Sequence, residues 1–160
     1  MSAATKPAPA RGEPSAGQAM DYVEFYRADP LDRIQIIKDG VPALKAKRII
    51  NDLEISSSSA FKALRVPVAT INRKAKNQEL LSPDESEKVL GIAKLIGQIE
   101  AMVEESGNPE GFNAPAWISR WLNEPLPAFG GTRPIELMDT MEGQALVSRT
   151  LDQIQSGAYA

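Results

Sequence analysis

The chain has 160 residues, and its 18 Lys and Arg against 21 Asp and Glu give a formal net charge of -3. It contains neither Cys nor His, which excludes a disulfide scaffold, a Cys or His zinc site, a Cys nucleophile and a Ser-His-Asp triad. Hydrophobic residues make up 42% and aromatic residues 6%, which favours one compact helical domain or two small domains sharing a core. We therefore expect an all-α protein with no metal and no cofactor.

The first 20 residues are rich in Ala, Pro, Gly and Ser and offer almost no large side chain to bury. Because ordering a residue costs roughly 1–2 kcal/mol, we expect residues 1–20 to form a disordered arm. This segment lacks the apolar centre of a secretory signal, and no run in the chain approaches the roughly 18 apolar residues of a membrane span. These features favour a cytoplasmic protein without membrane contact.

Helical spacing of apolar residues begins at Asp21 and continues toward the C-terminus. Proline and serine open several of the helices, and glycine or proline closes them. The expected helices cover residues 22–26, 30–39, 42–53, 56–64, 68–75, 82–106, 112–124, 132–138 and 142–156.

The helix at residues 82–106 has the clearest start signal, because Ser82, Pro83 and Glu85 fit the N-cap, N1 and N3 positions of a capping box. Its apolar residues recur at steps of three and four, at Val89, Ile92, Ile96, Ile99 and Val103. This stripe predicts one buried side, which packs either in the core of the chain or in the seam of a dimer. The last helix is expected to hold near one side Ala145, Leu146, Leu151 and Ile154.

Charge is unevenly distributed along the chain. Residues 61–80 carry five cations against one acid, whereas residues 81–110 carry two cations against seven acids. Residues 111–160 carry three cations against five acids. A basic pair of helices therefore precedes an acidic helix.

The basic pair has the layout of a helix-turn-helix, with a tight joint at Val66-Pro67 and the second helix rich in cations. In such a unit the apolar face holds the second helix against the first, while polar and cationic side chains meet base edges and phosphates. The candidate DNA-binding residues are Lys62, Arg65, Thr70, Asn72, Arg73, Lys74 and Lys76. An ordinary solvated helical face is the alternative interpretation, and the acidic net charge argues against strong non-specific DNA binding.

Two stretches of the chain resemble the Xre/MbcA/ParS-type antitoxins. The first, residues 55–89, reads ISSSSAFKALRVPVATINRKAKNQELLSPDESEKV and contains the two-helix segment with its LSPDES joint. In the second, residues 108–160, the distinctive parts are Trp121-Leu122, the PLPAFGG turn, Arg133-Pro134, Glu136-Leu137 and the GAYA ending. The resemblance covers about residues 30–160, and its C-terminal motifs are the more specific ones.

The resemblance implies a fold and a function. The implied fold is an Xre-like helix-turn-helix bundle, here at residues 21–107, followed by a small helical toxin-binding domain at residues 108–160. The implied function is that of a non-catalytic, type II antitoxin, which binds and neutralises a RES-domain, NAD-degrading toxin and represses its own operon at operator DNA. A homodimer within a hetero-oligomeric complex is also expected.

The same resemblance implies that the C-terminal tail lies at or near the active-site cleft of the toxin. Gly157, Ala158 and Ala160 are small enough for a narrow cleft, and Tyr159 adds an apolar ring with a hydroxyl group. A frayed terminus is the structural alternative. One departure from the family pattern is Pro67, which stands where a Ser or Thr cap is expected and offers no capping oxygen.

Three further side chains have two interpretations each. Arg133 makes either a contact with the toxin or a local ion pair with Glu136, three residues on. Trp117 and Trp121 share one helical face and either pack in the core or anchor an interface. Gly130 and Gly131 are assigned to a backbone turn.

Two other functions compete with the antitoxin hypothesis. A transcription regulator without a toxin partner would need only the helix-turn-helix. An enzyme would have to use carboxylate pairs such as Asp84-Glu85 or Glu104-Glu105. Adjacent residues on a helix do not face each other, so the sequence disfavours catalysis.

Overall fold

The structure, a computed structural model, describes residues 20–107, 109–155 and 157. Within these residues the chain is helical, and the only β-type pairing is an isolated antiparallel bridge between Pro42 and Leu80. The elements are α1 (Tyr22–Arg27), α2 (Pro30–Asp39), α3 (Ala43–Asp52), α4 (Ser57–Ala63), α5 (Val68–Lys76), α6 (Pro83–Glu105), α7 (Ala114–Leu122), η1 (Pro127–Phe129), η2 (Pro134–Leu137) and α8 (Met141–Gln155). The expected all-α fold is confirmed for this part of the chain. The arm expected at residues 1–20 falls, apart from Met20, outside the described residues.

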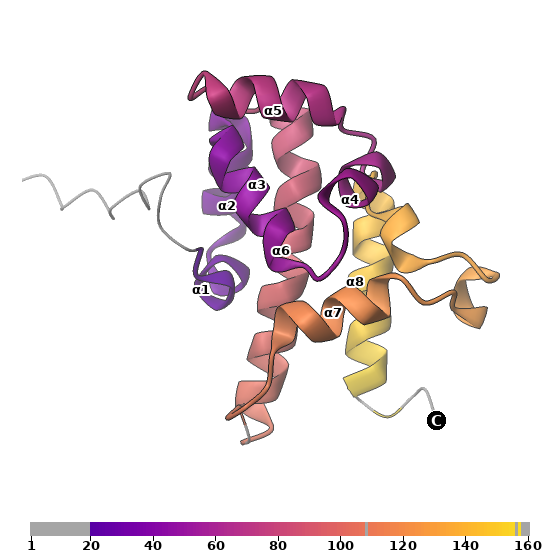
Figure 1. The fold of residues 1–160 in the computed structure, drawn as a ribbon. Coiled ribbons are helices and arrows are strands. Elements are labelled where there is room, and N and C mark those ends of the chain that lie inside the picture. The colour runs from indigo at the N-terminus through magenta and orange to yellow at the C-terminus, as the bar shows by residue number, and fades with distance from the viewer. Residues whose placement is uncertain (1–19, 108, 156, 158–160) are drawn as a thin grey trace, which may run out of the picture.

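The long helix α6 is the axis of the fold (Figure 1). Its capping box forms as expected, since the Glu85 amide donates to Ser82 Oγ at 3.1 Å and the Ser82 amide donates to Glu85 Oε2 at 3.0 Å. The stripe from Val89 to Ile99 is buried in the core of the chain itself. The alternative of a dimer seam at this stripe is therefore wrong.

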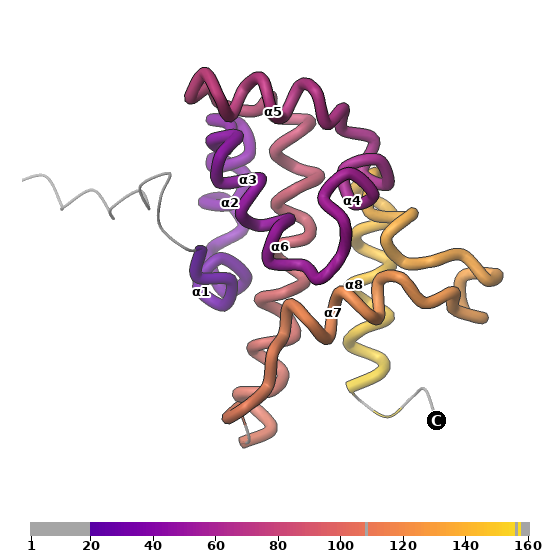
Figure 2. Tube along the Cα trace, in the orientation of Figure 1, coloured from indigo at the N-terminus to yellow at the C-terminus, as the bar shows by residue number. Residues whose placement is uncertain are grey.

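Helices α1, α2 and α3 pack against α6, with α1 beside its C-terminal half, where Arg27 pairs with Glu104, and α5 lies across the start of α6 (Figure 2). The C-terminal block comprises α7, η1, η2 and α8, and its helices α7 and α8 pack against α6. One continuous hydrophobic cluster includes Phe61 and Ile71 of the first group and Ile118 and Leu151 of the second. The two sets of helices thus share a core.

A buried polar network fixes α8 against α6. Gln98, which is almost fully buried, donates from Nε2 to the carbonyl oxygen of Ser148 at 3.0 Å and to Asp152 Oδ1 at 2.9 Å. Ser148 Oγ donates back to Gln98 Oε1 at 2.8 Å. Because hydrogen bonds are directional, this network sets the register of α8 and hence the point at which the C-terminal tail leaves the fold.

The buried face of α8 differs from the sequence expectation. Val147, Thr150 and Leu151 are buried, whereas Leu146 and Ile154 are exposed. Leu151 alone of the expected apolar set packs in the core, because the hydrogen bonds of Gln98 turn Ser148 and Asp152 toward α6.

Helix α2 is unusual because none of its residues is buried, although it contains one Leu and three Ile. Leu31 is 74% exposed, and Ile34 and Ile36 are also exposed. Leu80, another exposed apolar residue, pairs with Pro42 just before α3. An apolar surface therefore follows α2 and the start of α3.

Candidate functional site

The outward face of α5 carries part of the predicted DNA-binding set. Ile71 is buried and Val68 and Ala75 pack against the core, as expected for the inner face. Asn72 and Lys76 are exposed on the opposite side of the helix. Pro67 is the N-cap of α5 and makes no side-chain cap hydrogen bond, which agrees with the expectation from its chemistry.

Arg73 lies on the same exposed face, and Thr70 is partly buried beside it. Arg73 Nη1 is 3.9 Å from Glu79 Oε2, and both side chains are well exposed. A pair this long and this exposed is weak, so the guanidinium of Arg73 can turn toward a phosphate at small cost.

Lys74 has a different environment from the other cations of α5. Its Nζ atom donates to Glu85 Oε2 at 2.9 Å, and both side chains are only 18% exposed. Partial burial alone would raise the pKa of the Glu85 carboxyl, but the hydrogen bonds from Lys74 and Ser82 outweigh it and lower that pKa below its ordinary value. Lys74 therefore ties α5 to the start of α6, a structural role that the sequence assignment to DNA did not include.

The remaining two candidates, Lys62 and Arg65, lie on another surface. Both line a cleft of about 460 Å³ between α4 and the C-terminal block. Arg65 Nε is 3.1 Å from Asp139 Oδ2, which joins the helix-turn-helix joint to the segment between η2 and α8. Arg133, the predicted toxin contact, lines the same cleft. The structure thus brings together cations that the sequence assigned to two different functions.

Arg133 forms the expected local pair. Its Nη2 atom is 3.5 Å from Glu136 Oε1, and its backbone amide donates to Glu136 Oε2 at 3.2 Å. Arg133 is also the N-cap of η2. Both polar contacts of its guanidinium, to Glu136 and to Asn123 Oδ1, are 3.5 Å long, so the ion pair does not saturate its donors.

The C-terminal tail begins at the end of α8. Gly157 is exposed, with a φ of 75°, and its amide donates to the carbonyl oxygen of Ile154 at 3.2 Å. Ala158, Tyr159 and Ala160 lie outside the described residues. The end of α8 and the outward face of α5 are at opposite ends of the molecule (Figure 1).

The tryptophan pair belongs mainly to the core. The rings of Trp117 and Trp121 stack with centroids 6.2 Å apart and planes 13° apart. Trp121 is buried and Trp117 packs partly buried against the core, so core packing is confirmed for this pair. Gly130 and Gly131 both have positive φ, which confirms their assignment to a turn.

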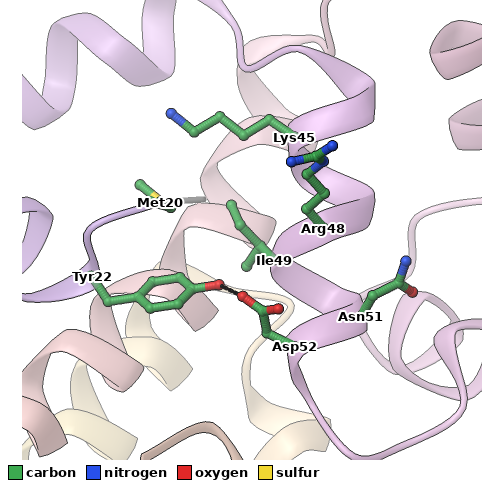
Figure 3. A pocket seen from close by; sticks show the side chains of 7 residues that line it. All are labelled: Met20, Tyr22, Lys45, Arg48, Ile49, Asn51 and Asp52. Atoms are coloured by element: carbon green, nitrogen blue, oxygen red, sulfur yellow. Dashed lines mark hydrogen bonds between the residues drawn. The ribbon is translucent and has the colours of Figure 1, made fainter. Parts of the chain in front are cut away.

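A second, smaller cavity of about 170 Å³ lies between the start of α1 and helix α3 (Figure 3). The Tyr22 hydroxyl donates to Asp52 across this cavity, which fastens α1 to α3. Burial and the contact with Asp52 raise the pKa of the Tyr22 hydroxyl far above its ordinary value. None of the predicted site residues lines this cavity, and its lining fits a structural joint.

The described residues hold no group of three or more carboxylates arranged to bind a metal ion. No helix in the described ranges is long and apolar enough to span a bilayer. One carboxylate of each pair considered for catalysis is engaged elsewhere: Glu85 in the capping box and Glu104 in a 3.0 Å ion pair with Arg27.

Fold and site together define a helix-turn-helix protein with an additional C-terminal helical block. Comparison with known families gives the same division. Residues 32–94 match an antitoxin Xre-like helix-turn-helix domain, and residues 110–157 match the antitoxin Xre/MbcA/ParS C-terminal toxin-binding domain. The chain is also 58% identical, over 87% of its length and 87% of the relative's, to a Sphingobium protein named Prs ADP-ribosylating antitoxin.

The chain therefore belongs to the Xre/MbcA/ParS-type antitoxin family. A more distant relative, named antitoxin Xre, comes from Pseudomonas putida and is 27% identical over 92 residues, which are 58% of this chain and 52% of the relative. As a family member the chain is an antitoxin that carries a helix-turn-helix domain and a domain for binding a toxin.

Proposed function

We propose that this antitoxin binds a RES-type, NAD-consuming toxin in the cytoplasm and blocks its active site with residues 157–160, and that it represses its own operon through α5. The observation that carries the first part is the match of residues 110–157 to a toxin-binding domain, together with the exposure of Gly157 just after α8. In this proposal the chain is not an enzyme.

The name of the Sphingobium relative supports the proposed substrate of the toxin, since that name specifies ADP-ribosylation. In ADP-ribosylation NAD is cleaved between nicotinamide and the adjoining ribose. The ADP-ribose passes to an acceptor side chain, and nicotinamide leaves. A toxin that hydrolyses NAD passes the ADP-ribose to water instead. Both reactions release nicotinamide, so the rate of nicotinamide release measures either activity.

The shape of the proposed tail suits an obstructing role. Gly157 already departs from helical geometry, and two alanines flanking one tyrosine lose little side-chain entropy when they enter a cleft. The tyrosine ring supplies most of the apolar area that such a contact can bury.

The second part of the proposal rests on the exposed polar face of α5. Asn72, Arg73 and Lys76 project away from the core, where they can reach bases and phosphates in a major groove. One copy offers few cations against an acidic background, so we propose a homodimer that reads a two-fold operator. The exposed apolar side chains of Leu31 and Ile34 on α2 support self-association.

The experiment that tests the proposal measures nicotinamide release by the toxin encoded beside the antitoxin gene, at increasing concentrations of antitoxin. The full chain should abolish release at about equimolar concentration. Deletion of residues 157–160 should raise the concentration needed for half inhibition by at least ~30-fold, the effect of losing one interface hot spot. Helical circular dichroism is the control for folding. Full inhibition by the truncated chain would refute the tail mechanism.

A further inference from the structure

The cleft between α4 and the C-terminal block has one wall from each family-matched region. Ser59, Lys62 and Ala63 come from α4, and Arg65 comes from the joint between α4 and α5. The opposite wall consists of Asn123, Arg133, Ile135, Glu136 and Asp139, all within the toxin-binding match at residues 110–157. A ligand in this cleft would contact both regions at once.

The cations of the cleft have spare hydrogen-bonding capacity. The ammonium group of Lys62 has no polar partner among the residues that the structure describes. The Arg65 side chain is 81% exposed and its Nε atom lies 3.1 Å from Asp139 Oδ2, so this exposed guanidinium has further donors to offer. The guanidinium of Arg133 makes its contacts with Glu136 and Asn123 at 3.5 Å. Three cationic groups therefore surround one concave space with donors to offer.

The backbone at Arg65 adds a second observation. Arg65 follows the end of α4 with a φ of 56°, in the left-handed region. Glycine is the usual residue at this position after a helix, and another side chain costs roughly 1 kcal/mol there. An arginine therefore stands at a backbone position that favours glycine, which indicates a function for its guanidinium.

We propose that this cleft is a second part of the toxin interface, separate from the tail, and that it receives an acidic segment of the toxin. In that complex a carboxylate of the toxin lies among Lys62, Arg65 and Arg133, and an apolar neighbour packs on Ile55 and Ile135. The inference rests on the proposed function, since it presupposes a complex with the toxin.

The lining of the cleft favours a protein segment over DNA. Glu136 and Asp139 lie among the cations, and they would repel a run of phosphates, whereas a protein segment can match both signs of charge. The apolar side chains of Ile55, Ala63 and Ile135 also line the space, and they give a side chain a surface that a phosphate cannot use. The exposed residues of α5 contribute nothing to this cleft.

The test uses two substitutions in the full-length antitoxin and one matched control. Lys62→Gln removes a cation that has no partner within the described chain. Arg65→Gly removes the guanidinium and relaxes the backbone. Gln78→Gly makes the same backbone change outside the cleft, because Gln78 also has a φ of 56°. Each cleft substitution should weaken toxin binding roughly tenfold, as expected for the loss of a charge-assisted contact.

Gln78→Gly should bind the toxin as wild type does, and all three variants should keep wild-type affinity for operator DNA. Toxin affinities at the wild-type level for both cleft variants would overturn the proposal. So would a loss of DNA affinity without a loss of toxin affinity, which would return Lys62 and Arg65 to the DNA surface.

A zero-length carbodiimide cross-link tests the chemistry directly, since it joins an amine to a carboxylate in contact with it. Mass spectrometry of the cross-linked complex should find Lys62 joined to an Asp or Glu of the toxin. Lys62→Arg keeps the charge and removes the amine, so it should keep the affinity and lose the cross-link. Toxin cross-links from Lys76 of α5 without any from Lys62 would contradict the proposal. If the wild-type chain forms no complex with the toxin, the proposed function itself fails.

Discussion

The outward face of α5 and the C-terminal block differ in both charge and shape. The α5 face is a convex helix surface on which Arg73 and Lys76 are exposed. The C-terminal block forms, together with α4 and the joint after it, a cleft in which three cations and two carboxylates mix. A convex cationic surface suits a groove of DNA, whereas a mixed cleft suits a protein. The net charge of -3 is thus the sum over surfaces of different charge.

The largest expected effect separates these two surfaces. The double substitution Arg73→Ala and Lys76→Ala should lower operator affinity roughly 30-fold. The slope of log affinity against log salt concentration should become shallower by about one to two. Nicotinamide release by the toxin should remain fully inhibited. Fluorescence anisotropy at several salt concentrations measures the first effect. Unchanged operator affinity would place the DNA contacts on another surface.

The joint between η2 and α8 provides the next test. A Cβ atom added at Gly143 would lie 1.8 Å from the carbonyl oxygen of Leu137, so Gly143→Ala forces the start of α8 to move. We expect a loss of about 2 kcal/mol in unfolding free energy and weaker toxin inhibition, because the direction of α8 sets the position of the tail. Operator binding should not change. Urea denaturation together with both binding assays checks this, and an equal loss in both assays would contradict it.

The ion pair between Lys74 and Glu85 holds α5 against the start of α6. Glu85→Gln should cost about 1–2 kcal/mol, since it weakens both the capping box and the ion pair. The folded-state pKa of Glu85 is lowered, so its contribution is present above the ordinary Glu pKa and is lost as pH falls through the folded-state value. The difference in stability between wild type and Glu85→Gln should therefore shrink below about pH 4. A difference that stays constant with pH would refute this role.

The smallest expected effect concerns the joint between α1 and α3, away from both surfaces. Tyr22→Phe removes the hydroxyl that donates to Asp52 and should cost about 1 kcal/mol of stability. Thermal unfolding monitors the cost, and operator and toxin affinities should equal those of wild type. A change in either affinity would show that this joint communicates with a binding surface.

Local signals in the sequence were sufficient for much of the fold. The capping box at Ser82 and the helix end at Gly40 depend on neighbours within one turn, and both form as expected. The face of α8 was misjudged because hydrophobic spacing alone favoured Leu146 and Ile154, both of which are exposed. Its actual orientation depends on Gln98, a polar residue of another helix.

The candidate functional site could likewise be predicted only in part from local sequence signals. Arg73 and Lys76 are exposed where the helix-turn-helix pattern placed them. The partnership of Lys74 with Glu85 and that of Arg65 with Asp139 arise only when separate helices meet. No local motif indicates a cleft whose two walls are distant in sequence. Lys62 and Arg65 were therefore assigned to DNA from the helix-turn-helix layout, and Arg133 to the toxin from the family resemblance.

The rate of nicotinamide release by the toxin tests the central claim most directly, when it is measured with equimolar wild type, Arg73→Ala/Lys76→Ala or the chain lacking residues 157–160. We expect full inhibition by wild type and by the α5 double variant, and little inhibition by the truncated chain. Loss of inhibition in the α5 variant equal to that in the truncated chain would contradict the division of the molecule into a DNA surface and a toxin surface.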